Sequence, residues 1–113
     1  MEITVAKLLD NAVLMSLRES FDTMEISRFE KIIHENVQEG VKFLVLDFSE
    51  LAFMDSSAIS CLVRNKNLLQ KRNIEMVIVD IPHDILNIFK LAYLDRFFTI
   101  IKRNNLLKHL DEK

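Results

Sequence analysis

The stretch from Leu44 to Leu69, LVLDFSELAFMDSSAISCLVRNKNLL, decides how the rest of this chain is read. Phe43, the residue before this stretch, begins an apolar run that ends at Leu46. Such a run is typical of a strand in a parallel sheet that is covered on both faces. Asp47 ends the run, and the composition of Ser49–Met54 predicts a short loop. The stretch therefore predicts a buried strand that exits into a loop.

A helix follows this loop and begins near Ser57. Asp55 and Ser56 both suit its N-cap, because their side-chain oxygens accept hydrogen bonds from the free N–H groups of a first helical turn. Apolar residues then recur at helical spacing, so one face is expected in the core and the other in solvent. The core face comprises Ile59, Leu62, Val63 and Leu69, and the solvent face comprises Arg64, Asn65, Asn67 and Lys71.

The position of Ser57 at the start of the helix favours a negatively charged group. Unpaired backbone N–H groups and the positive end of the helix dipole stabilise an anion, so a phosphate here would not unfold the helix. Helix capping is the simpler interpretation of Ser56 and Ser57 when only the local sequence is considered.

The same signals of apolar spacing, turn residues and caps predict the remaining elements. A hairpin comes first, and Asp22 or Thr23 caps the helix after it. Beyond the central helix we expect a strand, a helix that starts at Pro82, a last strand and a final helix. The predicted ranges are Ile3–Lys7 and Ala12–Leu17 for the hairpin, Ile74–Val79 and Phe97–Ile101 for the later strands, His83–Ala92 for the third helix, and a final helix capped by Asn104 or Asn105 that buries Leu106, Leu107 and Leu110.

This alternation predicts an α/β fold. We expect a single domain over residues 1–113, with the order β-β-α-β-α-β-α-β-α and a mixed, mostly parallel sheet of about five strands with helices packed on it. Sites in such sheets gather beyond the carboxyl ends of the strands. Glu19, Asp22, Asp47 and Asp55 are therefore expected to surround Ser57 with negative charge.

Composition excludes several classes of function. The net charge of −2 and the scattered lysines and arginines argue against nucleic-acid binding. The N-terminus lacks the pattern of a signal peptide, and no apolar run has the length of a membrane span, so we expect a cytoplasmic protein without membrane insertion. The single cysteine, Cys61, is expected to be a buried thiol.

The sequence gives little support for catalysis. A serine nucleophile needs a histidine base, and His34, His83 and His109 lie far from Ser57 in the sequence. Metal-binding and phosphate-loop motifs are absent from the sequence, so we expect no metal, no cofactor and no enzymatic activity. A receiver domain that accepts phosphate on Asp47 is a weaker interpretation, because Asp10-Asn11 supplies only one of the two acids needed after the first strand.

Four segments of the chain resemble the anti-sigma-factor antagonist family, the small bacterial STAS domains. Phe53–Ile59, FMDSSAI, is similar to the family signature F-M-D-S-S-G-L. Val45–Ser49 resembles the family's strand and loop before the signature, and Ile85–Phe98 resembles its V-x-x-L-F…L-x-x-x-F helix and strand. Glu19–Asp22 lies where the family has G-E-L-D, and nearly the whole chain aligns without large gaps.

The resemblance implies a function in transcriptional signalling by partner switching. In the family the second serine of the signature, here Ser57, is phosphorylated by the anti-sigma factor, which is a serine kinase. The unphosphorylated protein binds this anti-sigma factor and frees the sigma factor, phosphorylation blocks binding, and a serine phosphatase resets the system. The predicted partner-binding residues are Asp22, Asp55, Ser56, Ser57 and Ala58. Because no arginine or lysine lies within six residues of Ser57, we expect little internal rearrangement.

Departures from the family pattern leave alternatives open. Ala58 replaces the signature glycine; alanine suits a helical first turn, but its added methyl group could obstruct a partner that packs closely on the serine loop. Glu19 replaces the glycine of G-E-L-D, and Arg72-Asn73 replaces a glycine pair, although Asn73 tolerates left-handed geometry. The alternative is a STAS subunit of a lipid-trafficking transporter or of a stress-signalling complex, with Ser57 as a contact or helix cap. Ser56 as the acceptor, a monomer or weak dimer, and a small ligand in the serine cleft also stay open.

Overall fold

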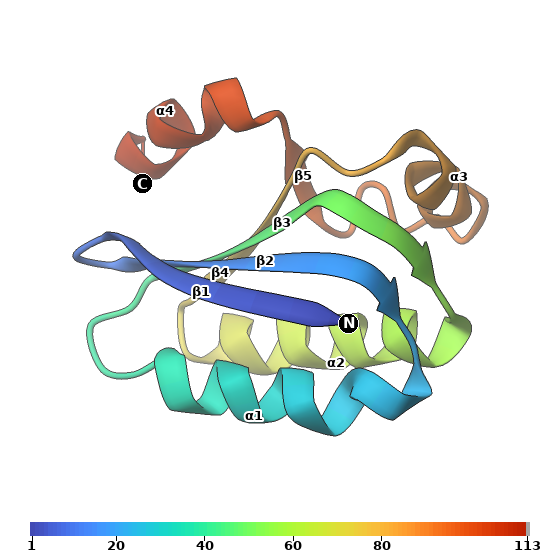
Figure 1. Ribbon diagram of the computed structural model, residues 1–113. Helices are drawn as coiled ribbons and strands as arrows, with labels where there is room; N and C mark the ends of the chain where they lie inside the picture. Colours follow the sequence, from blue (N-terminus) through green and yellow to red (C-terminus); the bar gives the residue numbers. More distant parts are fainter. Residues whose placement is uncertain (113) are drawn as a thin grey trace.

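A five-stranded sheet in the order β1-β2-β3-β4-β5 runs through the computed structural model, which describes residues 1–112 (Figure 1). β1 pairs antiparallel with β2, and the other pairs are parallel. This confirms the predicted α/β fold with a mixed, mostly parallel sheet. The strands are β1 (Glu2–Leu9), β2 (Ala12–Phe21), β3 (Phe43–Met54), β4 (Glu75–Val79) and β5 (Thr99–Ile101).

Helices cover both faces of the sheet. Figure 1 shows α1 and α2 together beneath the sheet and α4 on the opposite side. The helical elements are η1 (Thr23–Glu25), α1 (Ile26–Asn36), α2 (Ser56–Lys71), α3 (His83–Leu91), η2 (Arg103–Asn105) and α4 (Leu106–Asp111). Within residues 1–112, none of these helices is both long enough and apolar enough to cross a membrane.

The apolar run at the start of β3 is buried from both sides, as predicted. Leu44 and Leu46 belong to the larger core cluster, to which α1, α2 and α3 also contribute. Phe43 and Val45 face the other way and pack in a smaller cluster, beneath side chains of α4. Alternate residues of one strand thus enter two cores, which explains why the run has no polar positions.

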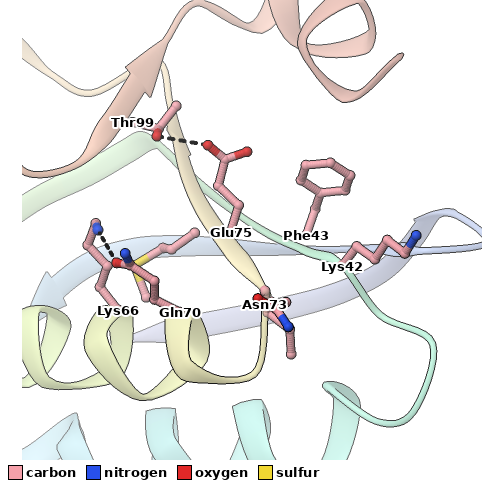
Figure 2. A pocket seen from close by; sticks show the side chains of 9 residues that line it. Lys42, Phe43, Lys66, Gln70, Asn73, Glu75 and Thr99 are labelled. Carbon is pink, nitrogen blue, oxygen red and sulfur yellow. Dashed lines mark hydrogen bonds between the residues drawn. The ribbon is translucent and has the colours of Figure 1, made fainter. Parts of the chain in front are cut away.

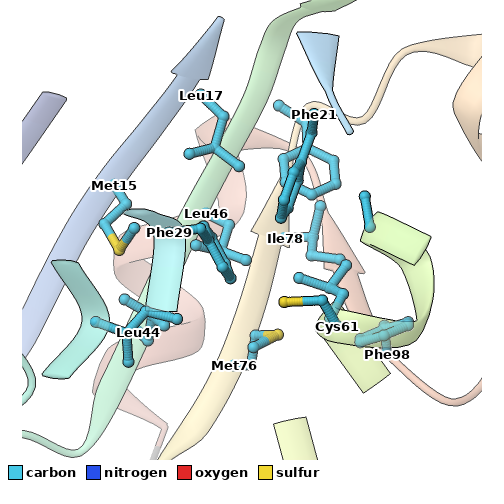
Figure 3. Packing of buried hydrophobic residues seen from close by; sticks show 14 of the residues in the cluster. Met15, Leu17, Phe21, Phe29, Leu44, Leu46, Cys61, Met76, Ile78 and Phe98 are labelled. Atoms are coloured by element: carbon cyan, nitrogen blue, oxygen red, sulfur yellow. The ribbon is translucent and has the colours of Figure 1, made fainter. Parts of the chain in front are cut away.

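Aromatic side chains connect the helices to the larger core (Figure 3). Phe21 at the end of β2 packs on Phe29 of α1, with ring centroids 4.7 Å apart. Phe98, before β5, packs on Phe89 of α3 at 5.5 Å. Cys61 of α2 is buried in the same cluster, which confirms the expected environment of this thiol.

The predicted loop over Ser49–Met54 is wrong, because β3 continues through it to Met54. β2 is longer than expected and offers a pairing partner along this whole length, ending with Phe21 beside Met54. Two register shifts interrupt the pairing, and one of them lies at Glu19, whose φ of 76° is left-handed. Backbone pairing and bulges therefore extend the strand where polar side chains suggest that it ends.

Two expectations for the helices are also corrected. Asn65 of α2 is buried, because its side chain meets Glu30 of α1 instead of solvent. Leu107 of α4 is exposed, and only its neighbours Leu106 and Leu110 enter the core. The C-terminus of α2 agrees with the prediction, since Asn73 adopts φ 59° and its N–H donates to the Gln70 carbonyl.

Candidate functional site

The carboxyl ends of β2 and β3 lie next to each other, and each is followed by a short polar segment. We call these segments the two corners of the site: Asp22–Thr23 after β2 and Asp55–Ser57 after β3. The backbone N–H of Asp55, after β3, donates to the carbonyl of Phe21, at the end of β2, over 3.2 Å. Asp22 caps η1, and its Oδ1 accepts from the N–H of Met24 at 3.0 Å. Backbone pairing of the two strands therefore places the two corners side by side, independently of the side-chain contacts of the site.

Asp55 is the N-cap of α2, which settles the choice between Asp55 and Ser56. Its Oδ1 accepts from the N–H of Ala58 at 2.8 Å and from the hydroxyl of Ser57 at 2.7 Å. Its Oδ2 accepts from the N–H of Thr23 at 3.1 Å and from the Thr23 hydroxyl at 3.3 Å. These donors, the Ser57 hydroxyl first, lower the pKa of Asp55 and keep it ionised at neutral pH.

Ser57 lies in the first turn of α2 and is half-buried, whereas Ser56 is exposed. Besides its bond to Asp55, the Ser57 Oγ lies 2.5 Å from Thr23 Oγ1, and either hydroxyl is able to donate. The sequence suggested Thr23 only as one of two possible caps for the next helix. Its contact with Ser57 joins residues 34 apart, and no local pattern signals it.

Ala58 differs from the other predicted partner-binding residues. It has no exposed surface and belongs to the larger core cluster. The methyl group therefore points into the core of the domain, and the expectation that it would directly obstruct a partner is wrong. Asp22, Asp55, Ser56 and Ser57 keep accessible surface at this end of the sheet.

Asp47 does not join the cluster around Ser57. β3 continues for seven residues beyond it, so Asp47 lies within the strand and not at its carboxyl end. Its Oδ2 pairs with Arg103 at 2.9 Å, and its Oδ1 accepts from the N–H of Ser49. The expected ring of four acids is therefore wrong for Asp47, which instead connects the sheet to η2.

Two exposed apolar residues lie close in sequence to Thr23 and Asp55. Met24, next to Thr23 in η1, is 86% exposed, and Phe53, two residues before Asp55, is 51% exposed. Met54, between Phe53 and Asp55, is buried, so the two residues before the cap have opposite environments. Exposed apolar groups next to a polar cluster are typical of protein contact surfaces.

A pocket of about 440 Å³ lies away from this end of the sheet, by the C-terminal half of α2 and the start of β4 (Figure 2). Four of its polar side chains are already paired with one another. Lys66 Nζ donates to Gln70 Oε1 at 3.1 Å, and Thr99 Oγ1 donates to Glu75 Oε2 at 3.1 Å. In Figure 2 Lys42 points away from these pairs, so the polar groups of the pocket do not converge on one point.

The histidines are distributed over three helices. His34 lies in α1, His83 starts α3, and His109 of α4 contacts Glu75 at 3.0 Å. Across residues 1–112, the hydrogen bonds of the Ser57 side chain go to Asp55 and Thr23. In the same range, no three His, Cys, Asp or Glu side chains are grouped closely enough to hold a metal ion.

Solved structures with the same fold include anti-sigma factor antagonists. SpoIIAA, an anti-sigma factor antagonist, matches in its unphosphorylated form with a TM-score of 0.81 and 15% identity over 99% of this chain and 98% of that one. The phosphorylated form of Bacillus SpoIIAA matches with a TM-score of 0.75 and 14% identity over 96% and 99%. The Thermotoga maritima protein TM1081 gives 0.84 and 16% over 98% and 95%.

An anti-sigma factor antagonist from Mycobacterium paratuberculosis also matches, with a TM-score of 0.79 and 21% identity over 96% of this chain and 93% of that chain. At these identities the structural matches establish the fold. The family follows from the sequence, because the model of the STAS domain matches residues 4–108. The chain therefore belongs to the STAS domain family.

Proposed function

We propose that this chain is an anti-sigma factor antagonist whose binding to its partner is switched by phosphorylation of Ser57. The observation that carries the proposal is the Ser57 hydroxyl, which lies in the first turn of α2 and donates to Asp55 at 2.7 Å. Membership of the STAS family and the fold shared with SpoIIAA, which has been solved in a phosphorylated form, support it.

Ser57 is a better acceptor than Ser56 on chemical grounds. In phosphoryl transfer from a nucleoside triphosphate, the serine oxygen bonds to the γ-phosphorus as the bond to the nucleoside diphosphate breaks, and the hydroxyl proton passes to a carboxylate base. The Ser57 proton already points at a carboxylate, which orients the oxygen and increases its negative character. Ser56 is exposed and lacks this contact with Asp55 among the described residues.

The phosphate acts at the partner surface in this proposal. It adds about −1.5 to −2 charges at neutral pH. The arginines of the two neighbouring helices are already paired, Arg28 with Glu25 and Arg64 with Glu30. Burying the extra charge in an interface without a counter-ion costs several kcal/mol, and a loss of about 3–4 kcal/mol weakens binding several hundredfold.

The partners follow from the same proposal. An anti-sigma factor with serine kinase activity binds the surface that contains Asp22, Asp55, Ser56 and Ser57, and a serine phosphatase restores the unmodified protein. The chain itself acts by binding, in the cytoplasm, as a single STAS domain over residues 1–113. It needs no cofactor and works as a monomer or weak dimer.

A pull-down from the lysate of the native organism tests the proposal. Wild type, Ser57→Ala and Ser57→Asp serve as parallel baits, and captured proteins are identified by mass spectrometry. Ser27→Asp is the matched control, because it adds the same charge to an exposed serine of α1. We expect an anti-sigma kinase with wild type, Ser57→Ala and Ser27→Asp, but not with Ser57→Asp.

Two results would contradict the proposal. Capture of the kinase by Ser57→Asp as efficiently as by Ser57→Ala would remove the switch. Capture of a transporter ATPase that is indifferent to the Asp substitution would assign the chain to the transport subunits, with Ser57 as a helix cap.

A further inference from the structure

Thr23 connects the two corners of the candidate site. Its backbone N–H donates to Asp55 Oδ2 at 3.1 Å, and its hydroxyl lies 3.3 Å from the same oxygen and 2.5 Å from Ser57 Oγ. These three contacts join η1 to the start of α2 across 32 to 34 residues of sequence. The side chains of Ser57 and Asp55 are therefore direct neighbours of η1.

We propose that Thr23 is a positioning residue that transmits the phosphorylation state of Ser57 to η1. This role of Thr23 in the cell rests on the proposed function, because it requires that Ser57 is phosphorylated there. The physical claim concerns the chain alone: the modified serine releases Asp55 from Thr23, and η1 loses its side-chain attachment to α2.

Phosphorylation removes the donor on which the present arrangement depends. Once Ser57 Oγ is bonded to phosphorus, it has no proton to donate to Asp55 Oδ1. The new group is an anion next to a carboxylate, and such a pair is repulsive. The phosphate also accepts hydrogen bonds from the free N–H groups of the first turn, so it competes with Asp55 for the start of α2.

Displacement of the Asp55 carboxylate breaks two hydrogen bonds of Thr23, because the Thr23 N–H and the Thr23 hydroxyl both donate to Asp55 Oδ2. The strand pairing beneath stays in place, since the bond from the Asp55 N–H to the Phe21 carbonyl does not involve the carboxylate. The change therefore affects the cap of α2 and, through Thr23, η1, which carries the exposed side chain of Met24. Modification of Ser57 thus alters apolar surface as well as charge.

The test uses phosphoserine inserted at position 57 by an expanded genetic code, which requires no kinase. Amide hydrogen exchange is measured by NMR, with the Thr23 N–H as reporter and the Asp55 N–H as internal reference. Phosphoserine at position 56 is the matched control, because it places the same charge one residue away on an exposed side chain. Thr23→Val, which keeps the backbone N–H and loses the hydroxyl, measures the contribution of the side chain.

Phosphoserine at position 57 is expected to accelerate exchange of the Thr23 amide at least about tenfold, the factor that corresponds to one hydrogen bond to a charged group. We expect less than about threefold at position 56, and an unchanged Asp55 amide in both proteins. In Thr23→Val the unmodified chain already exchanges faster at residue 23, so the effect of phosphoserine is smaller.

The inference is overturned if phosphoserine at position 57 leaves the Thr23 amide within about threefold of the unmodified rate, or if position 56 gives the same acceleration. These outcomes are separate from the fate of the proposed function. Loss of kinase capture by Ser57→Asp with an unchanged Thr23 amide keeps the switch and rejects the role of Thr23. Faster exchange of the Thr23 amide without capture of a kinase supports the coupling of Thr23 to Ser57 and rejects the proposed switch.

Discussion

Replacing Glu19 by glycine is expected to stabilise this protein. Glu19 is exposed in β2 and has φ 76°, the left-handed region that favours glycine. It lies beside a register shift between β2 and β3, where a bulge imposes this backbone conformation. The resembling family has glycine at the same position of its G-E-L-D motif. The chain therefore carries backbone strain that Glu19→Gly relieves with little loss of side-chain contact.

The magnitude follows from two opposing terms. A left-handed residue with a Cβ costs roughly 1–2 kcal/mol relative to glycine. Glycine in turn increases the entropy of the unfolded chain, which offsets about 0.4–1 kcal/mol. The net gain is about 0.8 kcal/mol in the free energy of unfolding. For a domain of 113 residues this raises Tm by about 3 °C.

Urea unfolding followed by circular dichroism measures this gain as a higher midpoint at constant m-value. Glu19→Ala keeps the Cβ and the strain, so its midpoint should stay near that of wild type. Glu50→Gly is a second control on the neighbouring strand, β3. The φ of Glu50 is not left-handed, so this substitution should lower the free energy of unfolding by about 1 kcal/mol. A midpoint for Glu19→Gly at or below wild type, or an equal gain from Glu19→Ala, would refute the reasoning.

Three further predictions concern buried and titrating groups. Asn65→Ala should lower the free energy of unfolding by about 2 kcal/mol in urea, because the buried Nδ2 donates to Glu30 Oε2 at 2.8 Å and to the Cys61 carbonyl at 2.9 Å. Burial raises the pKa of the Cys61 thiol to about 11, so a disulfide reagent at pH 8 should react about 100-fold more slowly than with the urea-unfolded chain; equal rates would contradict this. The lowered pKa of Asp55 means that its stabilising contribution is present above its unfolded pKa and is lost as pH falls below about 4. Acid unfolding of Asp55→Asn, which keeps an N-cap, should therefore depend less on pH than that of wild type.

Element order and sheet type were predictable because their signals are local. The unbroken apolar run at Phe43–Leu46 indicates a strand between two layers, and both core clusters contain its residues. The end of that strand was not predictable in the same way. Asp47 is polar and ends the apolar run, yet β3 continues because β2 supplies a pairing partner and Arg103 supplies a counter-ion. Both partners are remote in sequence, so the composition around Asp47 does not reveal them.

In the candidate site, too, the features set by local sequence were predictable and the contacts between remote segments were not. Asp55 as a cap and Ser57 in the first helical turn follow from residue type and position alone. The bonds of Thr23 to both residues, and of Asn65 to Glu30, join elements more than thirty residues apart. A polar residue that pairs across such a distance looks like any exposed polar residue in its own segment. The fold has to bring the segments together before its partner is known.

The departures from the family pattern bear on stability more than on the chemistry of Ser57. Ala58 takes the place of the signature glycine, but its methyl group is wholly buried in the larger core cluster. Glu19 keeps the left-handed conformation in which the family has glycine, although its Cβ makes that conformation costly. Neither change removes a donor or acceptor from the hydroxyl and carboxylate groups at the start of α2. Both substitutions therefore leave the polar contacts that orient the Ser57 hydroxyl in this chain intact.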